Sequence, residues 1–151
     1  MVSCAIFGHS EYNYESYTAK IEEKLLELIK NANVTQFFLG GRGAFDALCV
    51  KLLRKLQMEF SAVKIIQVYA YIPQEKRTYK NDLFDASVYL LERRVPPLYA
   101  IIERNKCMVK KVDYIFSGIM HEWGGAWQAV NYAKKQGKRI VTLLKSEGEE
   151  G

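Results

Sequence analysis

Three short glycine-containing segments of this 151-residue chain could hold an anionic ligand. They are Gly8-His9, Gly40–Gly43 and Gly124-Gly125, and each lies between an apolar run and a helical pattern. Glycine permits a positive φ and a close approach of the backbone to a ligand, and the free amides of a helix N-terminus attract phosphate. None of the three is a strict GxGxxG or a Walker A motif, so each one alone would also suit a simple turn. Together they predict a site for a phosphate-bearing ligand.

Several side chains beside these glycines have the chemistry to take part in binding. Arg42 could pair with a phosphate or be a solvated loop arginine, and His9 could donate to a phosphate or be structural. Asp46 could accept hydrogen bonds from a ribose or favour the N-terminus of its own helix. Trp123 could stack on a base or serve in packing. The predicted ligand-binding residues are Gly8, His9, Gly40, Gly41, Arg42, Gly43, Asp46, Arg104, Asn105, His121, Trp123, Gly124 and Gly125.

The elements that position these residues follow from the hydrophobic pattern. Apolar and β-branched runs predict strands at 2–7, 34–39, 63–72, 112–116 and 139–144, with one small strand at 88–91 inside a long polar loop from 74 to about 94. Helical spacing predicts a helix before each of the strands at 34, 63, 112 and 139. The third helix begins at Pro96-Pro97 and is expected to place Leu98, Ile101, Ile102 and Met108 on its inner face.

This alternation predicts an α/β fold, a three-layer Rossmann-like domain with a mostly parallel sheet and helices on both faces. A single domain is expected over 1–145, followed by a flexible acidic tail at 146–151. In such sheets, ligands bind outside the carboxyl ends of the strands, where the three glycine segments fall.

The composition of the chain limits the classes of partner and cofactor that we expect. The net charge is +5, but Lys and Arg are spread along the chain, which favours a solvated surface, so a nucleic-acid partner is not expected. The three cysteines form no CxxC or Cys/His cluster, so we expect no metal, no required cofactor, and a cytoplasmic, reducing location. No run approaches the length of a membrane span, so no membrane partner is expected.

Motifs over nearly the whole chain carry a resemblance to one superfamily. They are Gly8-His9 and residues 41–46, 95–97, 104–109, 113–115, 121–126 and 132–140. On these segments the chain resembles the SLOG superfamily, the Rossmann-like fold shared by Smf/DprA DNA-processing proteins and LOG phosphoribohydrolases, and it looks most like the small bacterial and phage branch. The resemblance implies a homo-oligomer, a dimer or higher, to which Tyr89, Leu90, Leu91 and Tyr99 could contribute.

The LOG pattern is only partly present. Glu103-Arg104 match the start of the LOG segment ERK…M…D, Asn105 replaces its lysine, and Gly124-Gly125 match the glycines of PGGxGTxxE. Trp123 replaces the proline, and the glutamate that helps to cleave the N-glycosidic bond is missing. Glu103 and Glu122 are the candidate catalytic carboxylates that could substitute for it.

The resemblance therefore implies binding more than catalysis. The expected function is a non-catalytic sensor or sequestering protein for a nucleotide-derived ligand, of NAD, ADP-ribose or cyclic-nucleotide type, in phage–host antiviral signalling. One alternative is an N-glycosidase or phosphoribohydrolase of the LOG type. Another is a DNA-processing accessory by analogy with Smf/DprA.

Overall fold

The computed structural model describes residues 1–71, 83–91 and 93–144. The predicted acidic tail and much of the predicted loop at 74–94 lie outside these ranges. The elements, in chain order, are β1 (Val2–Gly8), a 3-10 turn (Glu15–Tyr17), α1 (Thr18–Lys30), β2 (Val34–Leu39), α2 (Ala44–Gln57), β3 (Lys64–Tyr69), β4 (Ala86–Tyr89), α3 (Pro97–Lys111), β5 (Tyr114–Gly118), α4 (Gly125–Lys135) and β6 (Arg139–Thr142).

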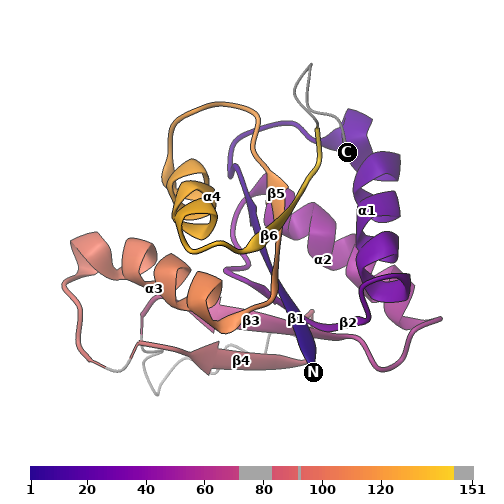
Figure 1. Cartoon of the computed structure of the whole chain (residues 1–151), viewed down its shortest axis with the longest axis horizontal. Coiled ribbons are helices and arrows are strands. Elements are labelled where there is room, and N and C mark those ends of the chain that lie inside the picture. Colours follow the sequence, from indigo (N-terminus) through magenta and orange to yellow (C-terminus); the bar gives the residue numbers. More distant parts are fainter. Residues whose placement is uncertain (72–82, 92, 145–151) are drawn as a thin grey trace.

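The six strands form one parallel sheet in the order β4-β3-β2-β1-β5-β6 (Figure 1). The predicted α/β Rossmann-like fold is confirmed. The chain builds the sheet outward from β1 to β4, then crosses back to place β5 on the other side of β1. This reversal is a topological switch point between β1 and β5, and it opens a crevice at the carboxyl ends of the strands.

The two faces of the sheet are covered by different pairs of helices. Along β1, Cys4 and Ile6 face the core under α1 and α2, whereas Ala5 and Phe7 face the core under α3 and α4. Successive side chains of a strand point to opposite faces, so a strand covered on both sides is apolar throughout. Figure 1 shows α1 and α2 on one side of the sheet and α3 and α4 on the other.

The apolar stripe predicted at the start of α3 is wrong. Leu98, Ile101 and Ile102 are 79%, 44% and 38% exposed, and the buried side of the helix is instead formed by Ala100, Asn105, Met108 and Val109. Ile101 lines a cavity together with residues that follow β3. In the first turns of α3, therefore, Leu98, Ile101 and Ile102 face solvent or the cavity, and Ala100 faces the core.

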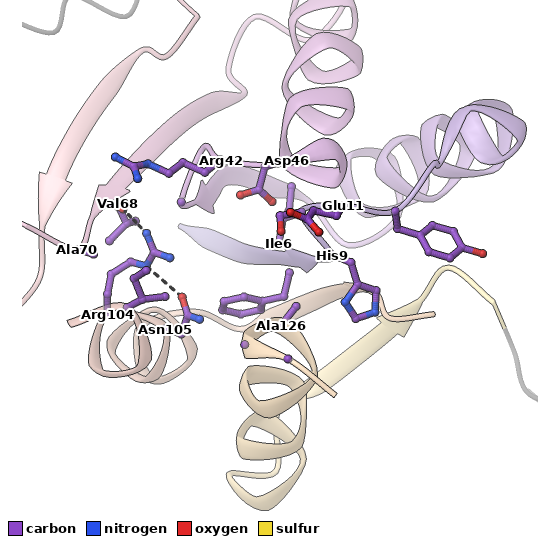
Figure 2. Close-up of a pocket in the computed structure, with 18 of the residues that line it drawn as sticks. Ile6, His9, Glu11, Arg42, Asp46, Val68, Ala70, Arg104, Asn105 and Ala126 are labelled. Atoms are coloured by element: carbon purple, nitrogen blue, oxygen red, sulfur yellow. Dashed lines mark hydrogen bonds between the residues drawn. The ribbon is translucent and has the colours of Figure 1, made fainter. Parts of the chain in front are cut away.

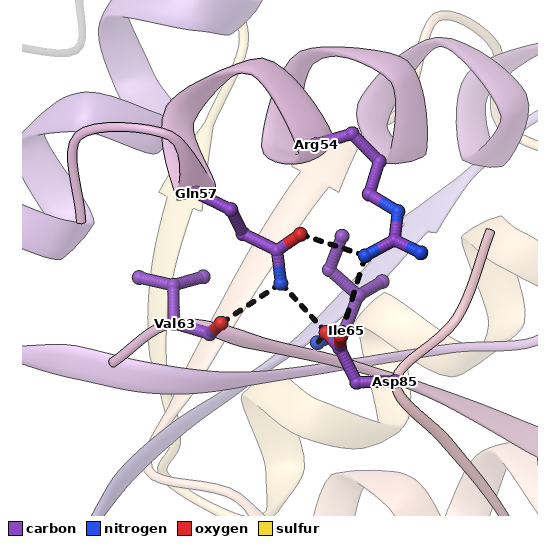
Figure 3. A network of polar contacts seen from close by, with 5 residues as sticks. All are labelled: Arg54, Gln57, Val63, Ile65 and Asp85. Atoms are coloured by element: carbon purple, nitrogen blue, oxygen red, sulfur yellow. Dashed lines mark hydrogen bonds and ion pairs between the residues drawn. The ribbon is translucent and has the colours of Figure 1, made fainter. Parts of the chain in front are cut away.

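A polar network fastens the edge strand β4 (Figure 3). The Asp85 carboxylate accepts hydrogen bonds from the Ile65 amide at 2.8 Å and from Gln57 Nε2 at 2.6 Å, and it lies 3.3 Å from Arg54 Nη1. Partial burial opposes ionisation, but these donors and the Arg54 charge outweigh it and hold the pKa of Asp85 below its usual value. The network joins α2, β3 and the start of β4.

Among the residues that the structure describes, no helix is both long and apolar enough to cross a membrane.

Candidate functional site

A cavity of about 1250 Å³ opens at the carboxyl ends of β1, β2 and β3, beside the switch point (Figure 2). Ligand pockets commonly measure about 300–1,000 Å³, so this one has room for a nucleotide. Every predicted ligand-binding residue lines it except Gly41 and Gly43. Sequence reasoning missed part of the wall, namely Ser10, Glu11, Tyr12, Gln67, Tyr69, Tyr71, Ile101 and Ala126.

On the side that faces α2, the end of β1 is closely packed. A Cβ on Gly8 would lie 2.2 Å from the Phe45 ring, and one on Gly118 would lie 2.4 Å from it, so both glycines make room for this buried side chain. The buried Tyr14 hydroxyl accepts a hydrogen bond from the His9 amide at 2.9 Å and donates one to the Gly118 carbonyl at 2.6 Å. Burial is the main cause that raises the pKa of Tyr14 to about 12. This hydroxyl ties the loop after β1 to the loop after β5.

Several amides of the loop Gly40–Gly43 and of the start of α2 are hydrogen-bonded inside the protein. The Gly41 amide donates to Asp46 Oδ2 at 3.0 Å. At the N-terminus of α2, the Ala44 amide donates to the Ser10 carbonyl at 2.9 Å and the Phe45 amide donates to the His9 carbonyl at 3.4 Å. These amides are therefore not free donors for a phosphate, and what the loop presents to the cavity is Gly40 and the Arg42 side chain.

The N-terminus of α4 is open in the same place. Gly124 caps it with φ 97° and no side-chain hydrogen bond, and the first helical bond runs from the Gln128 amide to the Gly124 carbonyl at 3.1 Å. In the described part of the chain, the amides of Gly125, Ala126 and Trp127 have no acceptor. A Cβ on Gly124 or Gly125 would meet nothing within 4 Å. Because Gly125 and Ala126 line the cavity, their amides are free hydrogen-bond donors at its edge.

Two arginines bring positive charge to the cavity. Arg104 on α3 donates from Nη1 to the Val68 carbonyl at 3.1 Å and from Nε to Asn105 Oδ1 at 3.0 Å, and its guanidinium leaves no room for a Cβ on Gly40 (Figure 2). Burial lowers the pKa of Arg104, the charge of Asp46 raises it, and the charge of Arg42 lowers it. Arg42 is exposed and Arg104 is partly buried, and both side chains line the same cavity.

Asp46 is the buried carboxylate of the cavity. Burial raises its pKa to about 7, against the opposing effects of the Gly41 amide, the Arg104 charge and the Arg42 amide. Asp46 is thus partly protonated near neutral pH, and it neutralises the two arginines only in part.

Three rings stack along one wall of the cavity. The centroids of His9 and His121 lie 3.4 Å apart at 20°, and those of His121 and Trp123 lie 3.8 Å apart at 15°. His9 Nε2 accepts hydrogen bonds from the amides of Met120 at 2.9 Å and His121 at 3.3 Å, so it carries no proton. Burial first, and then the neighbouring His121, lower the pKa of His9 to about 4. His9 is a neutral support for the loop after β5.

The structure does not bring the two candidate catalytic carboxylates to the cavity. Glu103 lies 3.7 Å from Lys106 on the same helix, and Glu122 is exposed. Glu11 and Asp46 are the carboxylates among the lining residues. Among the described residues, no group of three His, Cys, Asp or Glu side chains is placed to hold a metal ion.

No family model and no curated protein sequence matches the chain. Solved structures do. DNA processing protein A (DprA) from Streptococcus pneumoniae matches with a TM-score of 0.71 and 11% identity, over 99% of this chain and 52% of that one. DprA from Helicobacter pylori matches with a TM-score of 0.65 and 16% identity, over 98% of this chain and 67% of that one. The structural genomics target TM1055 matches with a TM-score of 0.58 and 17% identity, over 93% of this chain and 72% of that one.

These matches confirm the fold that the SLOG resemblance implied. The chain spans about half the length of the Streptococcus pneumoniae protein. They also correct one expectation, because the Helicobacter pylori structure describes a single-stranded DNA binding mode. The expectation that a nucleic-acid partner is unlikely is contradicted by this neighbour. It relied on the even spread of Lys and Arg in the sequence, and a local group of basic side chains needs no charge run along the chain.

Proposed function

We propose that the chain binds a nucleotide-type ligand in the cavity at the switch point. Its phosphate would lie among Arg42, Arg104 and the free amides at the start of α4. The observation that carries this proposal is the meeting of two arginines and an uncapped helix N-terminus at one cavity. Guanidinium groups and helix amides are both donors that suit phosphate oxygens.

The charges around the cavity favour the binding of an anion. Arg42 and Arg104 are close enough for the charge of one to lower the pKa of the other. Their buried counter-charge, Asp46, has a pKa of about 7 and is therefore incompletely ionised at neutral pH. Arg42 and Arg104 outweigh the partly ionised Asp46, and the Glu11 carboxylate in the same lining reduces the remaining positive charge. These groups lie in a partly desolvated place, where an anion interacts more strongly than in water. A phosphate would relieve the repulsion between the arginines.

The nucleotide could come from two sources with this shared chemistry. One is a free nucleotide of NAD, ADP-ribose or cyclic type, which the protein would sense or sequester. The other is one nucleotide of a single strand, a source favoured by the fold shared with DprA. Hydrolysis of an N-glycosidic bond has weaker support from the candidate carboxylates, because neither Glu103 nor Glu122 lines the cavity and Asp46 is engaged by the Gly41 amide. Glu11 is the other carboxylate of the lining, and an enzyme would have to use it.

Isothermal titration calorimetry with AMP, ADP-ribose and a short oligodeoxyadenylate tests the proposal. The exposed Arg42 can be removed without loss of a buried contact, so Arg42→Ala is the variant, and Arg139→Ala, an exposed arginine outside the cavity, is its control. A hydrogen bond to a charged group is worth about 1.5–3 kcal/mol, so we expect Arg42→Ala to weaken binding by about tenfold or more and the control to leave it unchanged. Absence of binding by all three ligands, or equal effects of the two variants, would contradict the proposal.

The same samples separate binding from catalysis. Mass spectrometry of AMP and ADP-ribose recovered after incubation should return both compounds intact. Release of a free base would favour the N-glycosidase alternative.

A further inference from the structure

The ring stack of His9, His121 and Trp123 is fixed at its inner end. The inner ring, His9, is 6% exposed, and two backbone amides from the loop after β5 hold its Nε2 atom. The middle ring, His121, has a buried Nδ1 atom with no hydrogen-bond partner in the described part of the chain. Since that edge of the His121 ring makes no hydrogen bond, contact with a ring on each face is what holds it.

The outer end of the stack is open. Trp123 is 68% exposed, although one face of its indole lies against His121 at an interplanar angle of 15°. Trp123 also lines the cavity, so part of its exposed side chain borders the space that would hold the ligand. Exposing a tryptophan to water leaves a large apolar surface unburied. A planar ring placed on the outer face would bury it and continue the stack.

The distance along the chain fits one nucleotide. Trp123 precedes Gly125 by two residues, and two extended residues span at most about 7 Å. The indole and the free amides at the start of α4 therefore lie within reach of the base and the phosphate of the same molecule. Asn105, which is 7% exposed, lines the same cavity and could bond to a polar edge of the ligand.

We propose that Trp123 is the base-binding platform of this cavity, on which a nucleobase stacks as the fourth ring after His9, His121 and Trp123. The inference rests on the proposed nucleotide-binding function and adds the recognition of the base. Stacking tolerates every base because each has a π face, and a purine offers the larger surface. The platform therefore predicts a preference for purine nucleotides over a sugar phosphate that lacks a base.

Tryptophan fluorescence tests the platform directly. The chain has two tryptophans, so Trp127→Phe leaves Trp123 as the reporter. Titrants are AMP, ribose 5-phosphate and a short oligodeoxyadenylate. We expect AMP to quench the emission of Trp123 and ribose 5-phosphate to bind without comparable quenching. Quenching by the oligonucleotide at lower concentration than AMP would identify a strand as the better source, and the reverse order would identify the free nucleotide.

Calorimetry of Trp123 variants gives the second readout. Loss of one base–aromatic stack corresponds to roughly 5- to 150-fold in affinity. Trp123→Ala should weaken the binding of AMP by that factor and leave the affinity for ribose 5-phosphate unchanged. Trp123→Phe should restore part of the lost affinity for AMP. Because the side chain is mostly exposed, the substitution removes little core packing. Equal affinity of Trp123→Ala and wild type for AMP, with ribose 5-phosphate still bound, would overturn the platform alone. Failure of AMP, the oligonucleotide and ribose 5-phosphate to bind would overturn the proposed function and the platform with it.

Discussion

Alanine at Gly43 or at Gly124 adds the same methyl group to nearly the same backbone in two different surroundings. Gly43 caps α2 at φ 92° and ψ 174°, and Gly124 caps α4 at φ 97° and ψ 175°. This region of φ and ψ is almost restricted to glycine, and forcing another residue into it costs about 1–3 kcal/mol. Both substitutions lose this amount of stability. Both also gain the same small amount of stability, because alanine makes the unfolded chain less flexible, and this gain cancels when the two variants are compared.

The two variants should differ in stability because the new methyl group meets different surroundings. A Cβ on Gly43 would lie 2.5 Å from the Cα of Ser10, which is backbone and cannot rotate away, whereas a Cβ on Gly124 would meet nothing within 4 Å. Overpacking typically costs about 1–3 kcal/mol. Moving Ser10 would also strain the hydrogen bond from the Ala44 amide to the Ser10 carbonyl. We therefore expect Gly124→Ala to lose about 1–3 kcal/mol of unfolding free energy and Gly43→Ala to lose about 1–3 kcal/mol more than that.

Urea denaturation followed by circular dichroism measures both losses, and the difference between them is the quantity of interest because the shared backbone cost drops out. Equal losses within error would show that the Ser10 contact carries no energy. A larger loss in Gly124→Ala would refute the reasoning, since it would mean that the open cap of α4 is the more constrained of the two.

Two further substitutions test the loops around the cavity. Tyr14→Phe removes the hydroxyl between the His9 amide and the Gly118 carbonyl and leaves buried polar groups unpaired, so unfolding should become easier by about 1–3 kcal/mol, and an unchanged denaturation midpoint would contradict this. Asp46→Asn tests a linkage to pH. The pKa of Asp46 is about 7 in the folded protein and the ordinary value is 3.8, so the folded state binds more protons between these values and loses stability as pH rises through this range. The stability of wild type relative to Asp46→Asn should therefore fall between about pH 4 and pH 7 and level off above that range. A constant difference would show that Asp46 is ionised throughout.

The fold was readable from the sequence because each inner strand is covered on both faces. Segments such as Val34–Leu39 are apolar runs of strand length bounded by turn residues, and the structure places β2 on those same residues. The observed β3 is shorter than the predicted strand at 63–72. It ends at Tyr69, and the residues that follow it line the cavity. The stripe of Leu98, Ile101 and Ile102 misled because periodicity reports which residues share a helix face and not whether a strand lies under that face.

The site was predictable as a location but not as chemistry. Glycines after strands identified the carboxyl edge of the sheet, and nearly all of the residues chosen there line the cavity. The sequence could not show which amides are free, since that depends on contacts between segments far apart in the chain. Gly43 and Gly124 look alike in sequence, yet only the helix after Gly43 has its amides taken by carbonyls of the loop after β1. The stack of His9 on His121 joins residues 112 positions apart and leaves no local pattern.

His9 explains why the two glycine-capped helices differ in role. Its carbonyl accepts the Phe45 amide at the start of α2, and its ring accepts the amides of Met120 and His121 in the loop before α4. Its own amide donates to Tyr14. His9 thus closes the N-terminus of α2 together with the Ser10 carbonyl, and it holds the loop that carries Trp123, while the first amides of α4 remain free in the described part of the chain. The sequence left His9 open as a phosphate donor or a structural residue, and its contacts place it as a support for the groups that would bind the ligand. Substitution of His9 should therefore disturb binding through the position of Trp123 and not through loss of a direct contact.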